Sequence, residues 1–500
     1  MTTSGLQEIM PLAPLQEGLL FHSVYDEAVE NVYAVQTALD LEGELDVAAL
    51  RAATETLFAR HSNLRAAFRY EGLRRPVQLI PYRVTVPWED VDLSHLPEAE
   101  RWTAADELLW TDRRRRFDLA RPPLMRFTLI RVGKRTHRLV MTNHHILLDG
   151  WSRPLLIREL IALYQTRGDD RDLPPVKPYR VYLQWLADQD RQQAVEEWRE
   201  ALADLDGPTL VAPDAGVRPA VIPQPVQRGL DADTHQALNT VAREHDLTLN
   251  TLVQGAWALV VSALTGQDDV VFGATVSGRP PEVAGIETMV GLFINTLPVR
   301  VRLHPAEPLV DVLARLQGQQ VALRSHLHLG LAEIQRLAGS QELFDTAVIF
   351  ENFPVDVEPG GGGQQPSGLR VIGVRGRSSS HYPLALVASA RSGLFFRLDY
   401  QPDLISEKQA HTVMEQLLRV VEAIAADPGG LVGRLELLDP AERHRVLEEW
   451  NGQPPGDGMP PVGVVALFEE QVAATPDAVA LTCEGESLTY AGLNARANRL

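Results

Sequence analysis

The run Asn143-His144-His145-Ile146-Leu147-Leu148-Asp149-Gly150-Trp151-Ser152 sets two adjacent histidines just before an acid and a glycine. This HHxxxDG pattern fixes four positions, two of them with a scarce residue, so chance produces it in about one or two per thousand chains of this length. The preceding residues 138–142 predict a strand, and apolar residues from Leu155 to Leu163 recur at helical spacing after a capping Ser152. The histidines then lie at a strand end, where successive side chains point to opposite faces, so only one imidazole can face a given cavity.

Composition limits the kinds of protein this chain can be. A length of 500 residues predicts two or three folded units, and a formal net charge of −19 argues against general affinity for nucleic acid or anionic membrane. The single cysteine, Cys483, excludes an intrachain disulfide and a cysteine-only metal cage, and it suits a reducing, cytoplasmic location. No apolar run approaches the roughly 20 residues of a membrane helix, and residues 1–8 show no signal-peptide pattern.

Helical and strand patterns alternate over the first 450 residues, which predicts an α/β fold. The predicted helices are 47–61, 98–116 (closed by four arginines), 179–205, 249–264, 309–324 and 404–426, and the predicted strands are 64–70, 77–80, 269–276, 292–302 and 344–350. Proline-rich stretches indicate a boundary between a first lobe, residues 1–178, and a second lobe, residues 179–450. The glycine-rich run 359–366 is predicted to be a loop.

The style of the sequence changes after Trp450. Residues 451–464 are rich in proline and glycine and predict a linker. A helix over 465–474 and a strand over 478–483 would then begin another domain, and residues 465–500 are too few to close its core.

Several motifs in fixed order give the chain a family resemblance. Besides HHxxxDG, they are the segments 11–22, 116–119, 123–126, 179–185, 277–280, 290–296, 350–354 and 381–384. Over residues 6–449 the chain resembles a condensation domain of a nonribosomal peptide synthetase. The resemblance implies two chloramphenicol-acetyltransferase-like α/β lobes, arranged as a V-shaped pseudo-dimer around a central tunnel.

The resemblance also implies partners. Upstream donor and downstream acceptor carrier proteins would present phosphopantetheine arms from opposite mouths of the tunnel, and no cofactor would be bound directly. Residues 465–500, with segments 476–480 and 488–490, are similar to the start of an adenylation domain. The nucleotide-binding motifs of such a domain are absent, so we do not expect these 500 residues to activate amino acids.

The chemistry implied is attack of an α-amine on an acyl thioester. An α-amine has a pKa of about 8 and must lose a proton, and a histidine with a pKa of about 6.5 is mostly neutral at pH 7 and suits that task. General-base assistance contributes about 10²–10⁴-fold, whereas alignment of two reactants supplies about 7–11 kcal/mol. The resemblance points to His145 as the group at the reaction centre, acting as a base or as a hydrogen-bond anchor for the amine.

The other motif residues receive structural interpretations. We expect His144 to point away from the tunnel and to fix local hydrogen bonds. Asp149 is expected to pair with an arginine and hold the loop, with Arg65 and Arg279 as candidate partners. At Gly150 a side chain would obstruct the pantetheine path or strain the turn.

Two further residues are candidate substrate contacts. Asn295 is a candidate to touch a substrate amide, with ordinary strand pairing as the alternative, and Trp151 is a candidate although tryptophan more often packs. The adjacent histidines lack metal-ligand spacing and have no supporting cysteine or acid cluster, so no metal site is predicted. No nucleophile elbow is present, which disfavours covalent catalysis.

Several related families and roles are alternatives. Epimerisation domains share HHxxxDG but end a module, cyclising domains replace the two histidines, and dual epimerising types need another histidine-rich motif that residues 22–26 do not supply. An acyltransferase using free coenzyme A would share the fold and the histidine, and a non-catalytic docking domain would be expected to lose His145 or Gly150. Segments 16–22 and 350–354 resemble domains that take a D-configured donor.

Overall fold

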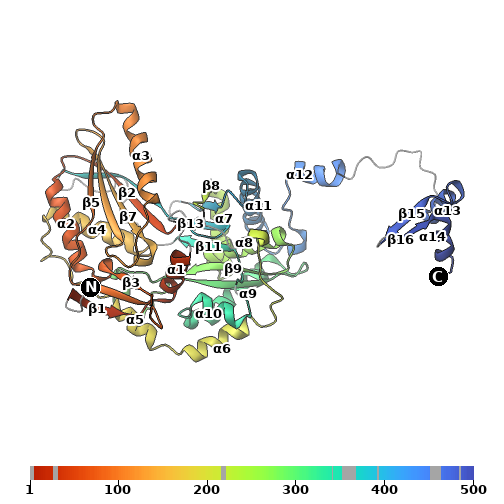
Figure 1. Cartoon of the computed structure of the whole chain (residues 1–500), viewed down its shortest axis with the longest axis horizontal. Coiled ribbons are helices and arrows are strands. Elements are labelled where there is room, and N and C mark those ends of the chain that lie inside the picture. The colour runs from red at the N-terminus through yellow and green to blue at the C-terminus, as the bar shows by residue number, and fades with distance from the viewer. Residues whose placement is uncertain are drawn as a thin grey trace. The chain divides into compact units, whose positions relative to one another are not determined.

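The computed structural model describes residues 5–25, 32–215, 221–340, 342–351, 368–390, 393–450, 463–483 and 486–499. The chain forms two compact units, Met1–Leu437 and Leu438–Leu500. The predicted loop at 359–366 and most of the predicted linker lie outside the described residues. Within the first unit, two sheets covered by helices lie side by side, one in each half of the unit (Figure 1).

The first half contains a five-stranded sheet that carries the histidine motif at the end of its central strand. Its order is β12-β2-β7-β6-β5. The strands are β2 (Ala34–Glu42), β5 (Trp88–Asp92), β6 (Met125–Arg131), β7 (Thr136–His144) and β12 (Arg370–Arg377). All of β7 after its first residue is buried, because strands flank it on both edges and helices cover both faces.

Alternate residues of these strands face different helices, as the two-residue period of a strand requires. Ala38 and Val140 pack with α3 (Glu98–Arg114) on one face. Leu39 and Leu139 belong to the larger apolar cluster on the other face, with α2 (Val47–Arg60) and α4 (Ser152–Gln165). Burial on both faces fixes the register of β7 and therefore the position of the two histidines.

The second half contains a six-stranded sheet of order β10-β9-β11-β13-β14-β8. Its elements are β8 (Gln224–Gly229), β9 (Asp269–Val276), β10 (Asn295–Arg302), β11 (Thr346–Glu351), β13 (Leu384–Ser389), β14 (Phe395–Tyr400), α7 (Ala232–Glu244), α8 (Leu249–Thr265), α9 (Leu309–Ala322) and α11 (Glu407–Ala426). Residues 251–261 of α8 are all buried, because this helix lies among β9, α9 and α11. Ser406 and Gln409 form a capping box that starts α11.

The remaining elements complete the two units. In the first unit these are β1 (Leu6–Met10), α1 (Pro14–Tyr25), β3 (Ala67–Arg69), β4 (Val77–Pro81), α5 (Arg180–Ala187), α6 (Arg191–Ala201) and α10 (Leu331–Leu337). The second unit contains α12 (Pro440–His444), α13 (Val464–Ala474), β15 (Val479–Cys483), β16 (Glu486–Thr489) and α14 (Tyr490–Ala497). β1, β4 and β3 form a small sheet, and β15 pairs with β16.

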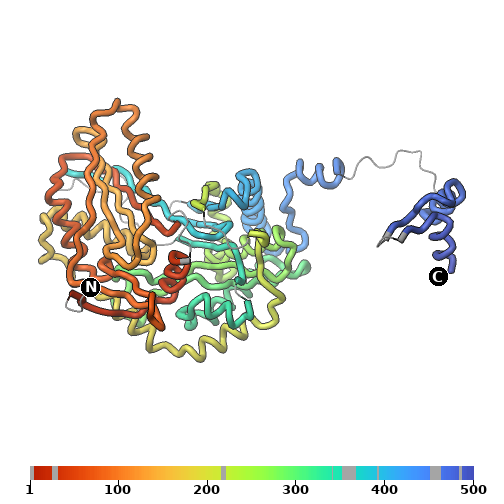
Figure 2. The backbone as a smooth tube through the Cα atoms, viewed as in Figure 1, coloured from red at the N-terminus to blue at the C-terminus, as the bar shows by residue number. Residues whose placement is uncertain are grey.

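The chain of the second half crosses back onto the first. β12 pairs antiparallel with β2 and adds an edge strand to the first sheet (Figure 2). Val283, Met289 and Phe293 also join the apolar cluster of the first half. The two halves therefore share buried contacts, and a division at residue 178 stays a prediction.

Most predicted helices and strands are confirmed, and three differ in ways that have physical causes. The helix predicted over 179–205 is two helices, because Asp190 caps α6 by accepting the Gln193 amide at 3.0 Å. In the strand predicted over 64–70, a 3₁₀ turn occupies Ser62–Arg65, and only β3 is extended. The strand predicted from 292 begins at Asn295.

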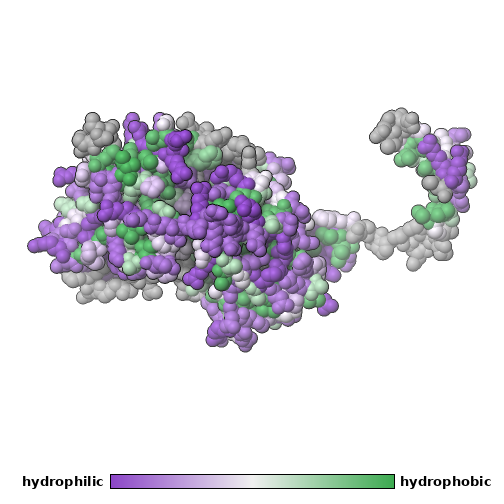
Figure 3. Space-filling model, turned by 90° about the horizontal axis from the view of Figure 1, so that it is seen from below, coloured by the Kyte–Doolittle hydropathy of each residue, from purple (hydrophilic) through white to green (hydrophobic). Residues whose placement is uncertain are grey.

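The surface has the mixed character of a protein that faces water. The face in Figure 3 is mainly hydrophilic, with small hydrophobic areas scattered over it. No single helix among the described residues is long and apolar enough to cross a membrane. The one pair that passes this test together, α7 and α8, is bent by 106°.

A buried ion pair in the first sheet gives a stability prediction. Arg138 on β7 is fully buried, and its Nε lies 2.6 Å from Asp40 Oδ1 on β2. Arg138→Leu leaves Asp40 without its main counter-charge and should lower the free energy of unfolding by about 3–5 kcal/mol, measured by urea denaturation. Arg131→Leu removes an exposed pair with Asp92 and should cost less than about 1 kcal/mol. Equal effects of the two substitutions would contradict the prediction.

Candidate active site

The motif turns sharply at the end of β7. His145 begins a short 3₁₀ turn, His145–Leu147, and its amide donates to the Tyr33 carbonyl at 2.9 Å. Its ring Nδ1 lies 2.9 Å from the Leu148 carbonyl, which can only accept, so Nδ1 carries the proton and Nε2 keeps its lone pair. Burial lowers the pKa of His145 below its usual range, so the ring is neutral at pH 7.

His144 faces the opposite way, as the strand geometry predicted. Its Nδ1 accepts the Ile146 amide at 3.2 Å, which leaves Nε2 to donate to the Ser23 hydroxyl of α1, also at 3.2 Å. The residue is 3% exposed, and burial lowers its pKa to about 3. His145 lines the large cavity described below, whereas His144 is not among its lining residues. His144 therefore holds α1 against the motif.

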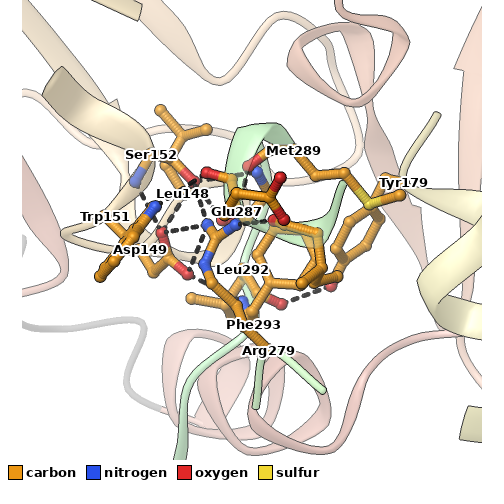
Figure 4. A network of polar contacts seen from close by, with 12 residues as sticks. Leu148, Asp149, Trp151, Ser152, Tyr179, Arg279, Glu287, Met289, Leu292 and Phe293 are labelled. Carbon is orange, nitrogen blue, oxygen red and sulfur yellow. Dashed lines mark hydrogen bonds and ion pairs between the residues drawn. The ribbon is translucent and has the colours of Figure 1, made fainter. Parts of the chain in front are cut away.

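Asp149 is fully engaged in the loop and has no lone pair aimed at a substrate (Figure 4). It is 1% exposed and accepts the Ser152 amide at 2.8 Å and the Phe293 amide at 3.2 Å. Both of its oxygens lie 3.2 Å from Nη2 of Arg279. This is the structural arrangement predicted from the motif, and it disfavours Asp149 as a base.

Arg279 belongs to the second half of the unit, so its pair with Asp149 joins the two halves. Its other terminal nitrogen donates to the carbonyls of Ile286 and Met289, and its guanidinium lies 3.9 Å from the ring centroid of Phe293. Two backbone contacts reinforce the pair: the Asp149 amide donates to the Gly291 carbonyl at 3.0 Å, and the Gly291 amide donates to the Ser152 hydroxyl at 3.0 Å. Burial lowers the pKa of Arg279.

The prediction that Arg65 is a candidate partner of Asp149 is wrong. Its guanidinium donates to the carbonyls of Pro81, Phe58 and Ala59 and to the side chain of Gln7. Arg65 therefore fastens the small sheet to the end of α2. The sequence offered no means of deciding which buried arginine meets the motif, because that choice depends on the crossing of the two halves.

The predicted cap at Ser152 is also wrong. Trp151 occupies the N-cap position, Ser152 is the first residue of α4, and Asp149 accepts its amide instead. Gly150 lines the cavity and is not among the described residues with a positive φ. Its backbone therefore supports the prediction of an unobstructed path rather than that of a strained turn.

The two predicted substrate contacts differ in what they have to offer. Both amide N–H groups of Asn295 are used, on the carbonyls of Leu327 at 3.0 Å and Leu329 at 2.8 Å, so no donor remains for a substrate. Trp151 lines the cavity, but its indole N–H donates to the Glu287 carbonyl at 2.9 Å, which leaves only ring surface for contact.

A cavity of about 2290 Å³ lies between the two halves of the unit. His145, Gly150 and Trp151 line it from the first half, and Ser277 and Arg279 line it from the second. This volume exceeds the roughly 300–1,000 Å³ of an ordinary small-molecule pocket and suits two extended substrates. No group of three possible metal ligands occurs among the described residues.

Sequence reasoning missed three aromatic residues in this cavity. Tyr33 supplies the carbonyl for the His145 amide, and His22 and His381 stack on each other nearby. Residues 22 and 381 each lie inside a motif segment, but nothing in the spacing of those segments brings them together.

Comparison with known proteins agrees with this geometry. The condensation domain family matches residues 6–447. The chain belongs to the condensation-domain family, the amide-forming acyltransferase domains of nonribosomal peptide synthetases. It is 37% identical over 506 residues to a linear gramicidin synthase of Brevibacillus parabrevis, matching 99% of this chain and 10% of that protein. The chain thus spans about a tenth of this curated relative.

Solved structures support the same fold. The first condensation domain of the calcium-dependent antibiotic synthetase, solved with a substrate analogue, matches with a TM-score of 0.71 and 22% identity over 87% of this chain and 100% of that one. The X-domain of teicoplanin biosynthesis, solved in complex with OxyB, matches with a TM-score of 0.72 and 26% identity over 86% of this chain and 96% of that one. The predicted α/β, chloramphenicol-acetyltransferase-like fold is confirmed.

The pairing of Asp149 with Arg279 rather than Arg65 can be measured. In double-mutant cycles of unfolding free energy, Asp149→Leu and Arg279→Leu should show a coupling of about 0.5–3 kcal/mol, because each side chain leaves the other unpaired. Asp149→Leu and Arg65→Leu should be additive within about 0.5 kcal/mol, because they share no partner. Coupling in the second cycle and none in the first would contradict the assignment.

Proposed function

We propose that this domain forms a peptide bond between two substrates held as thioesters on carrier-protein phosphopantetheine arms. The donor is an upstream peptidyl or aminoacyl thioester, and the acceptor is a downstream aminoacyl thioester. The observation that carries the proposal is the neutral His145 ring, whose Nε2 has a lone pair and no hydrogen bond to a described residue, in a wall of the large cavity.

The reaction balances with the groups available. The acceptor nitrogen attacks the thioester carbonyl carbon, a C–N bond forms, the C–S bond breaks, and the amine proton finally resides on the thiol of the donor arm. Nε2 of His145 is able to accept that proton from the nitrogen and return it to the sulfur. An anchoring role, in which Nε2 accepts a hydrogen bond from the amine, needs the same neutral tautomer.

The cavity contributes alignment and exclusion of water. Residues from both halves line it, so two arms that enter it would meet beside His145. Alignment of this kind supplies about 7–11 kcal/mol, more than the proton transfer alone. Gly150 adds no side chain at the cavity wall, which supports passage of a narrow pantetheine arm.

Domain organisation and partners form the finer part of the proposal. The two lobes would comprise residues 1–178 and 179–450, and residues 465–500, with α13, β15 and β16, would begin an adenylation domain. Condensation domains in synthetases work with carrier domains, and the resemblance of residues 16–22 and 350–354 favours a D-configured donor.

The likeness to the teicoplanin X-domain, solved in complex with OxyB, favours a second candidate, a docking domain without catalysis. Retention of His145 and Gly150 at the cavity favours the catalytic candidate.

Loss of the His145 ring should reduce product formation. With donor-loaded and acceptor-loaded carriers, His145→Ala should form the dipeptidyl thioester about 10²–10⁴-fold more slowly than the native domain, followed by mass spectrometry. His245→Ala, a change at an exposed residue after α7, is the matched control and should be unchanged. Full activity of His145→Ala, or product from coenzyme A thioesters without carriers, would contradict the proposal, whereas inactivity of the native domain would favour docking.

The pH profile should report the lowered pKa of His145. A base works when it is deprotonated, so kcat/KM should persist as the pH falls through 6.5 and decline only at lower pH. The acceptor amine, with a pKa of about 8, adds an increase at alkaline pH that His145→Ala should share. The profile is measured from about pH 5 to about pH 9. An acid limb centred at or above pH 6.5 would contradict the assignment.

A further inference from the structure

A second pair of histidines lies in the cavity beside the motif. His22 of α1 and His381, which precedes β13, stack with ring centroids 4.4 Å apart. The Tyr33 ring lies 6.4 Å from His22 and 6.1 Å from His381, and all three residues line the cavity. Because the Tyr33 carbonyl accepts the His145 amide at 2.9 Å, this cluster packs directly against the backbone of the proposed reaction centre.

His381 is held in place but its ring has polar atoms to spare. Its carbonyl accepts the Gln401 side-chain amide at 2.6 Å, and the rings of His22 and Tyr382 lie against its own. No described residue forms a hydrogen bond with either ring nitrogen of His381. Polar atoms of a restrained side chain in a largely apolar wall incur a desolvation penalty unless a partner arrives, so the cavity has room for a ligand that supplies one.

The charge state of the ring indicates what that ligand would offer. Burial, together with the neighbouring His22, holds the pKa of His381 well below its usual range, so the ring is neutral. A neutral imidazole presents one N–H donor and one nitrogen acceptor. An amide presents the complementary carbonyl and N–H, whereas a bare acyl chain presents neither next to its first carbon.

We propose that His381 is a substrate-binding residue, whose ring forms a hydrogen bond with the backbone amide or amino group of an aminoacyl thioester and so holds that thioester in front of His145. His22 orients the ring by stacking. This inference rests on the proposed function and adds a specificity element to it, because a donor or acceptor that lacks an α-nitrogen would lose the contact.

Two substitutions separate hydrogen bonding from shape. His381→Phe keeps a flat ring for stacking but removes both polar atoms, and His381→Asn keeps a donor and an acceptor but loses the ring. His245→Phe, at an exposed position after α7, controls for a histidine-to-phenylalanine change elsewhere. Amide formation is measured with loaded carriers, first varying the donor at saturating acceptor and then the reverse.

The expected result is a change in KM for one substrate. His381→Phe should raise that KM about 3–10-fold, the loss of one neutral hydrogen bond, with kcat little changed. His381→Asn should recover most of the affinity, and His245→Phe should resemble the native domain. The arm in which KM rises identifies the donor or the acceptor as the group bound. Unchanged KM in both arms, or an asparagine variant as impaired as the phenylalanine variant, would overturn the inference.

A measurement on the native protein keeps the test independent of variant folding. Diethylpyrocarbonate modifies accessible imidazoles, and its reaction at His381 is followed by peptide mass spectrometry. A saturating aminoacyl-pantetheine amide, which cannot transfer its acyl group, should protect His381, and equal modification with and without it would overturn the inference. Native activity with these negative results would reject this inference alone, whereas absence of amide formation by the native domain would reject the proposed function.

Discussion

The buried ion pair between Asp149 and Arg279 is the constraint on which the site depends. Both side chains lie in the interior, where an unpaired charge costs several kcal/mol, so each charge requires the other to be in place. Asp149 follows the histidines in the first half of the unit, and Arg279 follows β9 in the second. The pair therefore joins the halves at the edge of the cavity and fixes the loop that carries His145.

The two histidines divide the work because they occupy successive positions at a strand end. His144 turns inward, and α1 is fastened to the motif through the Ser23 hydroxyl and through Gln16, whose side chain donates to the Ile146 carbonyl at 3.0 Å. His145 turns to the cavity with its proton on Nδ1. The direction of one carbonyl, that of Leu148, thus decides which ring nitrogen is available for chemistry.

Local patterns in the sequence predicted what depends on local geometry. Helical periodicity gave α2, α3 and α8 nearly to their ends, and strand alternation showed that a single imidazole of the motif faces a cavity. The partner of Asp149 was not decidable between Arg65 and Arg279, because each is a buried arginine and the choice depends on contacts between distant segments. His381 was missed for the same reason, since the crossing of β12 brings it beside α1.

The claim that His145 offers Nε2 to the substrate can be tested directly by ¹⁵N NMR of the domain labelled in its histidine side chains. Comparison with His145→Ala assigns the His145 ring signals. The account predicts the tautomer with the proton on Nδ1 and an unprotonated Nε2 at pH 7, with Nε2 perturbed when an acceptor aminoacyl-pantetheine is added. A proton on Nε2, or a ring that no acceptor perturbs, would contradict the account.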